Sequence, residues 1–238
     1  QMSGLFNDSK TFVDMPMKSD PEQVLERFAA LPKNPTKQVL QSFLDENFAP
    51  AASDVERWIP PDFEESPSFL QRITNSTLRE FAANINDLWR ILGRKLSASV
   101  AEHPQRHSSL GTPHPTVVPG GRFRESYYWD SYWIIRGLLI CGMNETATNL
   151  VRNLASWVDA YGFVPNGGRV YYLTRSQPPL LSDMVARVFN ATRSLELVRE
   201  VFPSLEREYG FWMTPIPPTS LDATATAAAA FLGTGAGA

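Results

Sequence analysis

Residues 119 to 132 read Pro119-Gly120-Gly121-Arg122-Phe123-Arg124-Glu125-Ser126-Tyr127-Tyr128-Trp129-Asp130-Ser131-Tyr132. The two adjacent glycines let the backbone turn sharply before a helix begins. Arg122 then supplies a planar guanidinium fork, Asp130 a carboxylate acceptor and Trp129 a flat apolar face. This combination predicts a loop and a helix start that together bind a ligand.

A second stretch of the same character reads Pro165-Asn166-Gly167-Gly168-Arg169-Val170-Tyr171-Tyr172-Leu173-Thr174-Arg175-Ser176-Gln177-Pro178-Pro179. An Asn-Gly pair followed by an apolar run is a hairpin signal, so we expect a short β-hairpin near 166–175. The same Asn166-Gly167 pair is also typical of a plain turn. Gln177, which precedes two prolines, also suits a residue that satisfies backbone groups of the loop.

The side chains of the two stretches suit a sugar better than a phosphate. A pyranose offers hydroxyl groups for carboxylates, guanidinium groups and amides, and C–H faces for aromatic rings. A glycine pair followed by Arg122 at a helix start also suits an anion. Glu125 and Asp130 add negative charge, however, and no Gly-Lys-Ser/Thr motif occurs. Two structural alternatives stay open, an ion pair of Arg122 with Glu125 or Asp130 and a core position for Trp129 and the aromatic residues one turn further on.

The rest of the apolar pattern predicts helices separated by proline loops. We expect one helix to open at Pro21 with Asp20 as its N-cap. Further helices are expected over 36–48, 69–99 (one helix, or two broken near Asn75), 126–141, 144–161, 180–192 and 194–213. The segment 126–141 is apolar almost all round, which predicts a buried helix. Strands and helices do not alternate, and no short repeat occurs. The fold class is therefore all-α, a helical barrel or an irregular bundle.

The composition is that of a folded and nearly neutral protein. Its 238 residues are 43% hydrophobic, and 22 Lys+Arg against 25 Asp+Glu give a net charge of −3, which argues against nonspecific binding to nucleic acid. Cys141 is the only cysteine and the three histidines share one proline-rich loop. We therefore expect no intrachain disulfide, no metal site and no cofactor. No apolar run of about 18 residues predicts a membrane-spanning helix.

Four N-glycosylation acceptor patterns begin at Asn7, Asn75, Asn144 and Asn190. Together they favour the secretory pathway and an extracellular or cell-surface location, with a leader removed or not included, since residues 1–10 lack an apolar core. Residues 214–238 are low in complexity, and we expect them to be disordered. A lipid-anchor signal is a competing interpretation of this tail, which its small side chains disfavour.

The two dense stretches resemble the trehalase family. Residues 119–132 fit every fixed position of the family motif Pro-Gly-Gly-Arg-Phe-x-Glu-x-Tyr-x-Trp-Asp-x-Tyr, and residues 165–179 match its Pro-Asn-Gly-x-Arg…Arg-Ser-Gln-Pro-Pro block. The run Lys10-Thr11-Phe12-Val13-Asp14-Met15-Pro16 is similar to the family's Lys-x-Phe-x-Asp opening. The resemblance covers residues 5–213 and is closest to the N-terminal portion of the animal enzymes.

This resemblance implies that residues 1–213 are the N-terminal part of an (α/α)6 barrel that hydrolyses α,α-trehalose to two glucose molecules with inversion. The implied partner is trehalose, without a metal or cofactor, and animal members include lipid-anchored forms at the membrane. Asp130 is then a hydroxyl-binding carboxylate and not the proton donor. Carried over position by position, the residues that line the glucose subsite next to the scissile bond are Arg122, Trp129, Asp130, Asn166, Arg175, Ser176 and Gln177.

The sequence departs from the family at the catalytic groups. The family's general acid is an Asp in a Ser-Gly-Trp-Asp-Phe-Ser-type motif, and its general base is a Glu beyond a Gln-Trp-Asp-x-Pro motif. Neither motif occurs in these 238 residues, so no catalytic residue is assigned. We expect a truncated trehalase that is inactive alone and leaves the apolar segment 134–140 partly uncovered. The alternative is a noncatalytic carbohydrate-binding or regulatory fragment.

Overall fold

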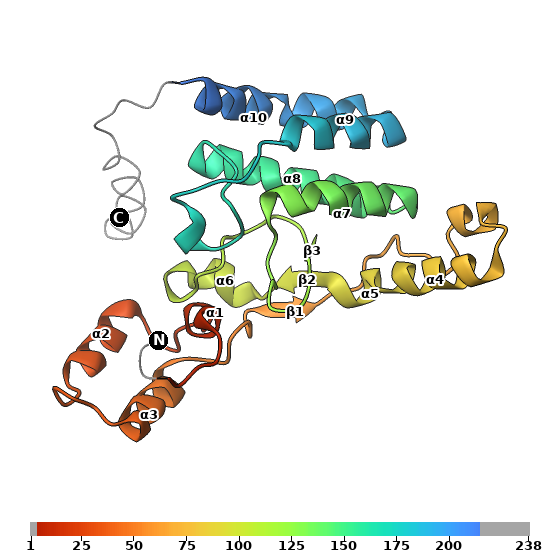
Figure 1. Ribbon diagram of the computed structural model, residues 1–238. Coiled ribbons are helices and arrows are strands. Elements are labelled where there is room, and N and C mark those ends of the chain that lie inside the picture. The colour runs from red at the N-terminus through yellow and green to blue at the C-terminus, as the bar shows by residue number, and fades with distance from the viewer. Residues whose placement is uncertain (1–3, 215–238) are drawn as a thin grey trace. The chain divides into compact units, whose positions relative to one another are not determined.

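The computed structural model describes residues 4–214, and the chain divides into two compact units (Figure 1). Of the described residues, 4–56 and 96–111 form the first unit, and 57–95 and 112–214 form the second. The described chain is mostly helical, with one small sheet, which confirms the predicted helical class. The tail predicted at 214–238 lies outside the described residues apart from Thr214, and the domain boundary at 213 stays a prediction.

The first unit is built from short helices and turns. These are α1 (Ser9–Val13), α2 (Pro21–Ala29), α3 (Lys37–Asn47), α6 (Ala98–Glu102) and the 3-10 turn η2 (Pro104–Arg106). The hydroxyl of Thr36 accepts the Val39 amide at 3.3 Å and so caps α3. Asp20 precedes α2 as predicted, but its carboxylate makes no cap bond. It accepts a hydrogen bond from Arg106 at 2.8 Å instead, and this bond holds the pKa of Asp20 below its ordinary value.

The small sheet has the strand order β1 (Val55–Arg57), β2 (Gly93–Leu96), β3 (Thr116–Val117). Strands β2 and β3 run antiparallel, with Gly93 opposite Val117 and Arg94 opposite Thr116. The sheet was not predicted, because β2 falls inside the segment 69–99, which was expected to be helical.

The helical pattern of 69–99 holds only as far as residue 92. After the 3-10 turn η1 (Ser68–Arg72), the chain breaks at Asn75 as expected, and the Asn75 side chain accepts the Leu78 amide at 3.0 Å to cap α4 (Ser76–Asp87). The short helix α5 (Trp89–Leu92) then ends at Gly93. A Cβ on Gly93 would lie 2.0 Å from the carbonyl oxygen of Trp58, whose amide donates to the Gly93 carbonyl at 3.1 Å. This close backbone pairing explains why a strand follows in place of more helix.

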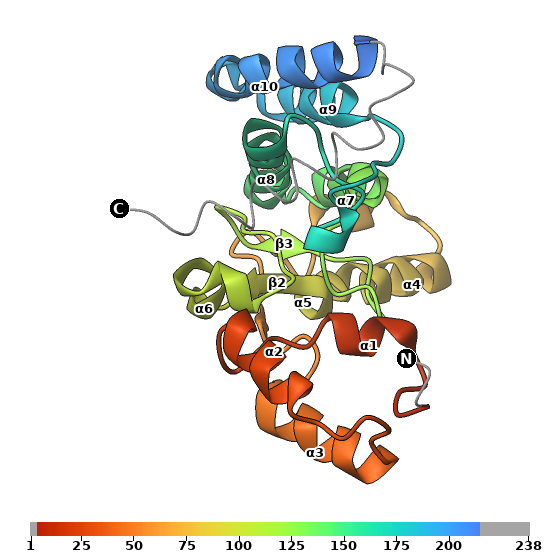
Figure 2. The ribbon, with the colours of Figure 1, turned by 90° about the vertical axis from the view of Figure 1, so that its left-hand side faces the viewer.

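The long helices of the second unit stack around α8 (Figures 1 and 2). Helix α8 (Asn144–Tyr161) packs against α7 (Tyr128–Ile140), α9 (Leu181–Thr192) and α10 (Leu195–Met213). Its apolar spacing is confirmed, because Leu150, Val151, Leu154, Trp157 and Val158 are all buried. The helix ends at Gly162 with φ of +83°, a left-handed conformation that favours glycine.

The hairpin predicted near 166–175 is wrong, because Val170–Tyr172 form a 3-10 turn, η3. The ends of this segment do meet, since the Asn166 amide donates to the Arg175 carbonyl at 2.9 Å. Between them, however, Arg169 is fully buried and Tyr172 is buried beside it. Packing of these inward side chains overrides the strand propensity of the apolar run.

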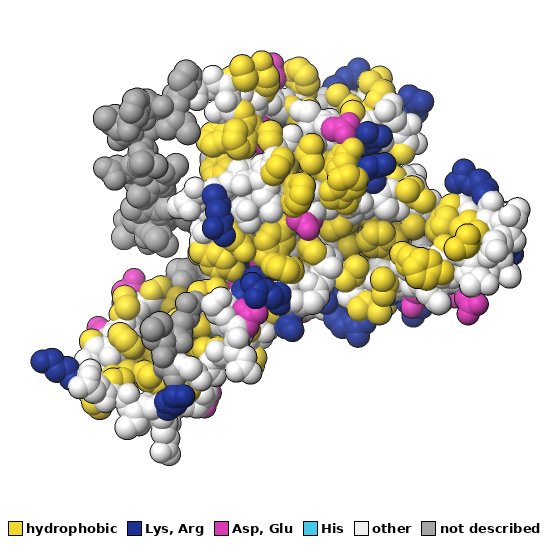
Figure 3. Space-filling view, in the orientation of Figure 1, with side chains coloured by type: hydrophobic (Ala, Val, Ile, Leu, Met, Phe, Trp, Pro, Cys, Tyr) yellow, Lys and Arg dark blue, Asp and Glu magenta, His cyan; other side chains and the backbone are white. Residues whose placement is uncertain are grey.

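Apolar side chains remain exposed on α4 and α7, as the yellow areas over these helices show (Figure 3). Helix α7 buries Ile135 and Leu138 but exposes Trp133 and Ile140. The prediction of a helix buried all round is therefore wrong, and the prediction of a partly uncovered segment at 134–140 is confirmed. Among residues 4–214, no helix has the length and apolar content needed to cross a membrane.

Candidate functional site

The candidate site lies in the second unit, where the segment 165–179 runs against the start of α7. Tyr127, the N-cap residue of α7, forms a β-bridge with Gly167. The Tyr128 amide donates to the Asn166 carbonyl at 3.3 Å. A Cβ on Gly167 would lie 3.0 Å from the backbone oxygen of Ser126, so this close approach of two backbones requires glycine. The two stretches singled out in the sequence thus form one structural unit.

Gln177 fastens the end of the segment to the helix start. Its Oε1 accepts the backbone amide of Trp129 at 3.0 Å. The first amides of a helix have no partner within the helix, so Gln177 satisfies one of them. Gln177 was considered as a residue that satisfies backbone groups of its own loop, but the backbone group that it binds belongs to α7. Within residues 4–214, the Nε2 amide of Gln177 makes no hydrogen bond, which leaves it available to a ligand.

Trp129 and Asp130 occupy the first turn of α7 with their side chains accessible. The Trp129 side chain is 46% exposed, which rules out a core position for it. Asp130 is half-buried, and within the described chain no basic side chain forms an ion pair with it. Burial raises the pKa of the Asp130 carboxyl above its ordinary value. An accessible indole face can cover the C–H face of a sugar, and an accessible carboxylate in the same helical turn can accept hydrogen bonds from sugar hydroxyl groups.

Arg122 and Arg175 flank a row of three aromatic rings. The Arg122 guanidinium lies 5.2 Å from the Phe123 ring centre, and Arg175 lies 5.0 Å from that of Tyr172. Tyr127 joins the two rings edge to face, with centroid distances of 5.5 Å to Phe123 and 5.6 Å to Tyr172. Cation–π contacts of this kind hold the planar guanidinium groups in place. Both arginines are exposed, one at each end of the row.

Ser176 has a supporting position in the loop. Its hydroxyl donates to the Val164 carbonyl at 2.6 Å and lies 3.2 Å from the Gln177 carbonyl. The hydroxyl proton is therefore engaged with the backbone, and what remains for a ligand is the acceptor capacity of the oxygen. Of the seven predicted residues, Trp129 and Asp130 lie in the first turn of α7. Asn166 and Gln177 accept backbone amides of that turn, Asn166 through its carbonyl and Gln177 through its side chain.

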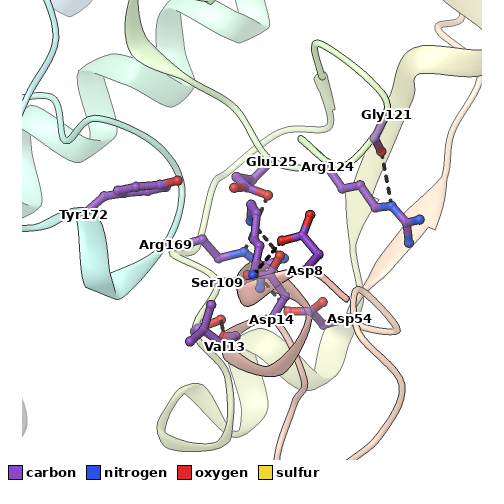
Figure 4. A network of polar contacts seen from close by, with 12 residues as sticks. Asp8, Val13, Asp14, Asp54, Ser109, Gly121, Arg124, Glu125, Arg169 and Tyr172 are labelled. Carbon is purple, nitrogen blue, oxygen red and sulfur yellow. Dashed lines mark hydrogen bonds and ion pairs between the residues drawn. The ribbon is translucent and has the colours of Figure 1, made fainter. Parts of the chain in front are cut away.

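A buried charged pair, Glu125 with Arg169, was not found from the sequence (Figure 4). The Glu125 Oε1 accepts the Tyr127 hydroxyl at 2.5 Å, and its Oε2 lies 3.7 Å from the Nε of Arg169. The Tyr127 hydroxyl also lies 3.1 Å from that of Tyr172. Glu125 therefore has Arg169 as an ion-pair partner, 44 residues away along the chain. The sequence signal that could have predicted a buried Arg169 is its position directly after two glycines, where the backbone can turn so that a long side chain points inward.

A second buried network of hydrogen bonds lies at the end of the segment 165–179, where α9 begins. The Tyr128 hydroxyl donates to Glu208 on α10 at 2.6 Å and accepts the amides of Leu180 and Leu181 at 3.0 Å each. Burial raises the pKa of Glu208, while the hydrogen bond from Tyr128 acts in the opposite direction. This network fixes the start of α9 directly after Gln177 and the two prolines. Glu208 lies on the same face of α10 as the buried residues Leu197 and Val201. A glutamate at such a position is the sequence signal that could have predicted a buried acceptor.

The accessible groups of the site suit a neutral polar ligand. Within the described ranges, no three His, Cys, Asp or Glu side chains gather where an ion could bind. The accessible groups are a carboxylate, an amide, an indole face and two guanidinium groups on three neighbouring segments. Such a set binds hydroxyl groups through directional hydrogen bonds and an apolar face through the ring.

Comparisons with known proteins agree with the two motifs. The trehalase from Apis mellifera is 44% identical over 218 residues, which cover 90% of this chain and 35% of the bee protein. The trehalase from Homo sapiens is 44% identical over 216 residues, covering 89% of this chain and 37% of the human protein. Among solved structures, a neutral trehalase from Saccharomyces cerevisiae is 38% identical with a TM-score of 0.38, and the match covers 40% of this chain and 18% of that chain.

The family assignment rests on most of the sequence. The chain spans about a third of the length of these curated relatives. The model of the family described as Trehalase matches residues 4–230, which extends beyond residue 213, where the resemblance was expected to end. With this match and the two fitted motifs, the chain belongs to the trehalase family.

Proposed function

We propose that the second unit binds α,α-trehalose at the start of α7 and supplies the glucose-binding side of a trehalase site. Trp129 covers the C–H face of one glucose ring, and Asp130 accepts hydrogen bonds from its hydroxyl groups. Gln177 and Asn166 add amide groups, and Arg122 and Arg175 donate from the two ends of the ring row. The hydrogen bond from the Trp129 amide to Gln177 carries this proposal, because it fixes two of the predicted ligands to each other at 3.0 Å.

Hydrolysis of trehalose to two glucose molecules is the reaction to which this binding side contributes. An inverting glycosidase needs a general acid and a general base that are about 6.5–9.5 Å apart, with a water on the base side. The motifs that carry these groups in the family do not occur among these 238 residues. Each such group contributes about 10²–10⁴-fold to the rate. The 238-residue polypeptide by itself therefore binds the sugar without turning it over.

Replacing Asp130 by asparagine tests this assignment. Removing the charge of an acceptor that binds sugar hydroxyls is expected to weaken trehalose binding about tenfold or more. Stability is expected to change little, because Asp130 has no ion pair within the described chain. Isothermal titration calorimetry measures the affinity, and thermal unfolding measures the stability.

Asp183→Asn is the matched control. Asp183 lies in the first turn of α9, as Asp130 does in α7, and its carboxylate lies 3.5 Å from Arg187. This control is expected to keep the trehalose affinity. Equal affinity in the natural chain and in Asp130→Asn, with a lower unfolding temperature in the variant, would show that Asp130 is structural and would refute the proposal.

We also propose that the protein passes through the secretory pathway and reaches the extracellular space or the cell surface. In support, all four acceptor asparagines, Asn7, Asn75, Asn144 and Asn190, are exposed. Exposure is a requirement for attaching a bulky glycan. Attachment to the membrane through a lipid stays an expectation from the family resemblance.

A further inference from the structure

An apolar cavity of about 520 Å³ lies in the first unit, between α2, α3 and the segment around α1. This volume is within the range of roughly 300–1,000 Å³ that is usual for small-molecule sites. All ten side chains that line the cavity are apolar, and three of them, Val24, Phe43 and Leu44, are buried and form its floor. The cavity therefore selects an apolar ligand or ligand segment.

One wall of the cavity is a continuous series of five phenylalanine rings. Neighbouring ring centres are 5.4–6.2 Å apart along the series Phe28, Phe43, Phe48, Phe12 and Phe6. These rings come from α1, α2, α3 and their flanking segments. A series of rings forms a long apolar surface, which suits an extended chain better than a compact molecule.

The mouth of the cavity opens to solvent through two side chains of α2. Leu25 is 64% exposed and Phe28 is 54% exposed, although both line the cavity. Large apolar side chains that are exposed around a hollow lose water when a ligand enters, and this favours binding. Their exposure also allows them to be changed with little effect on the folded state.

A lysine stands at the edge of the cavity. Lys37 precedes the lining residues Leu40 and Leu44 by one and two helical turns, so all three lie on one face of α3. Its ammonium group lies 3.3 Å from the position that a Cβ on Gly4 would occupy, and Gly4 adjoins the lining residue Leu5. Within residues 4–214, Lys37 forms no ion pair or hydrogen bond. An available positive charge thus lies at one end of an otherwise apolar cavity.

We propose that this cavity binds a single unbranched acyl chain that ends in a carboxylate, as in a medium- or long-chain fatty acid. The hydrocarbon tail lies along the phenylalanine series, and the carboxylate pairs with the ammonium group of Lys37. The apolar lining of the cavity is complementary to the hydrocarbon tail, and the positive charge at its edge is complementary to the carboxylate. The site is separate from the sugar site and does not depend on the proposed function.

The full chain is titrated with dodecanoate below its critical micelle concentration and followed by calorimetry. Decanoate and dodecanoate are expected to differ in affinity by about fourfold for each added methylene. Dodecanol is expected to bind about two- to fivefold more weakly than dodecanoate, because it lacks the charge that pairs with an exposed lysine. Dodecyltrimethylammonium is expected to bind more weakly still. Affinity that is independent of chain length, or equal for the cation and the carboxylate, would refute the proposal.

Three variants and a membrane assay complete the test. Lys37→Gln is expected to reduce the affinity for dodecanoate to that for dodecanol, whereas Lys33→Gln, in the loop before α3, leaves it unchanged. Leu25→Gln is expected to weaken the binding of both ligands. Equal loss in the two lysine variants would overturn the pairing with Lys37. The protein is also mixed with anionic phosphatidylserine vesicles. If it binds them and dodecanoate does not compete with this binding, the surface binds membranes and the proposal is overturned.

Discussion

Replacing Arg169 by methionine is expected to lower the free energy of unfolding by about 3–5 kcal/mol. Arg169 is fully buried, and its Nε lies 3.7 Å from the carboxylate of buried Glu125. Methionine fills a similar volume but leaves the buried Glu125 carboxylate without the guanidinium group of Arg169. Removing one partner of a buried ion pair leaves the other charge desolvated and without compensation. The loss of stability is therefore larger than the net contribution of the intact pair.

Denaturant unfolding of matched variants measures this effect. Arg207→Met is the control, since Arg207 pairs with Asp159 at an exposed position, and such pairs contribute about 0–1 kcal/mol. The double variant Arg169→Met with Glu125→Gln removes both charges and is expected to recover part of the loss. Equal losses in Arg169→Met and Arg207→Met would contradict a buried ion pair beneath the site.

Replacing Tyr128 by phenylalanine is expected to lower the free energy of unfolding by about 3 kcal/mol, because a buried polar group without a partner costs about 1–3 kcal/mol. The hydroxyl of Tyr128 has three partners, the Glu208 carboxylate and the amides of Leu180 and Leu181. The ring itself is fully buried and is kept in the variant. The effect therefore isolates the three hydrogen bonds, and urea unfolding measures it.

Tyr209→Phe is the matched control on α10, where Tyr209 is 67% exposed and a change near zero is expected. In the Tyr128→Phe variant the loop that carries Gln177 is also expected to be less firmly positioned. The affinity for trehalose is therefore expected to be lower. A loss of stability in Tyr209→Phe as large as that in Tyr128→Phe would refute the special role of the buried hydroxyl.

The pH dependence gives a second check of this network. Burial raises the pKa of Glu208 above its ordinary value of 4.5, so the folded chain holds this proton to higher pH than the unfolded chain does. Between 4.5 and the raised value, the contribution of Glu208 to stability therefore falls as the pH rises. Glu208→Gln is expected to remove this fall. The cost of Tyr128→Phe is expected to be larger at pH 8 than at pH 5, because the lost bond favours the charged carboxylate.

Local sequence signals predicted the elements whose faces are set by nearby residues. The spacing of apolar residues gave α8 its bounds and buried face, and Gly162 gave its end. The strand at Gly93 could not be predicted in this way, because it depends on close approach of the Trp58 backbone, 35 residues earlier in the chain. The 3-10 turn at Val170–Tyr172 likewise depends on the burial of Arg169.

The same distinction applies to the candidate site. The two motifs identified the segments that contribute polar groups, and the Tyr127–Gly167 bridge joins those segments. The partners of the individual groups were not predictable from spacing. Glu125 lies 44 residues before Arg169, and Tyr128 lies 80 residues before Glu208, so only the folded chain brings each pair together.

The most direct test of the central claim is a titration of the 238-residue chain with trehalose in which glucose is measured in the same samples. We expect saturable binding that is weaker in Asp130→Asn, and no glucose above the level of a protein-free blank. Absence of binding by a chain whose helical circular dichroism is intact would contradict the sugar site at the start of α7. Release of glucose that disappears in Asp130→Asn would contradict the separation of binding from catalysis and would require an acid and a base within this chain.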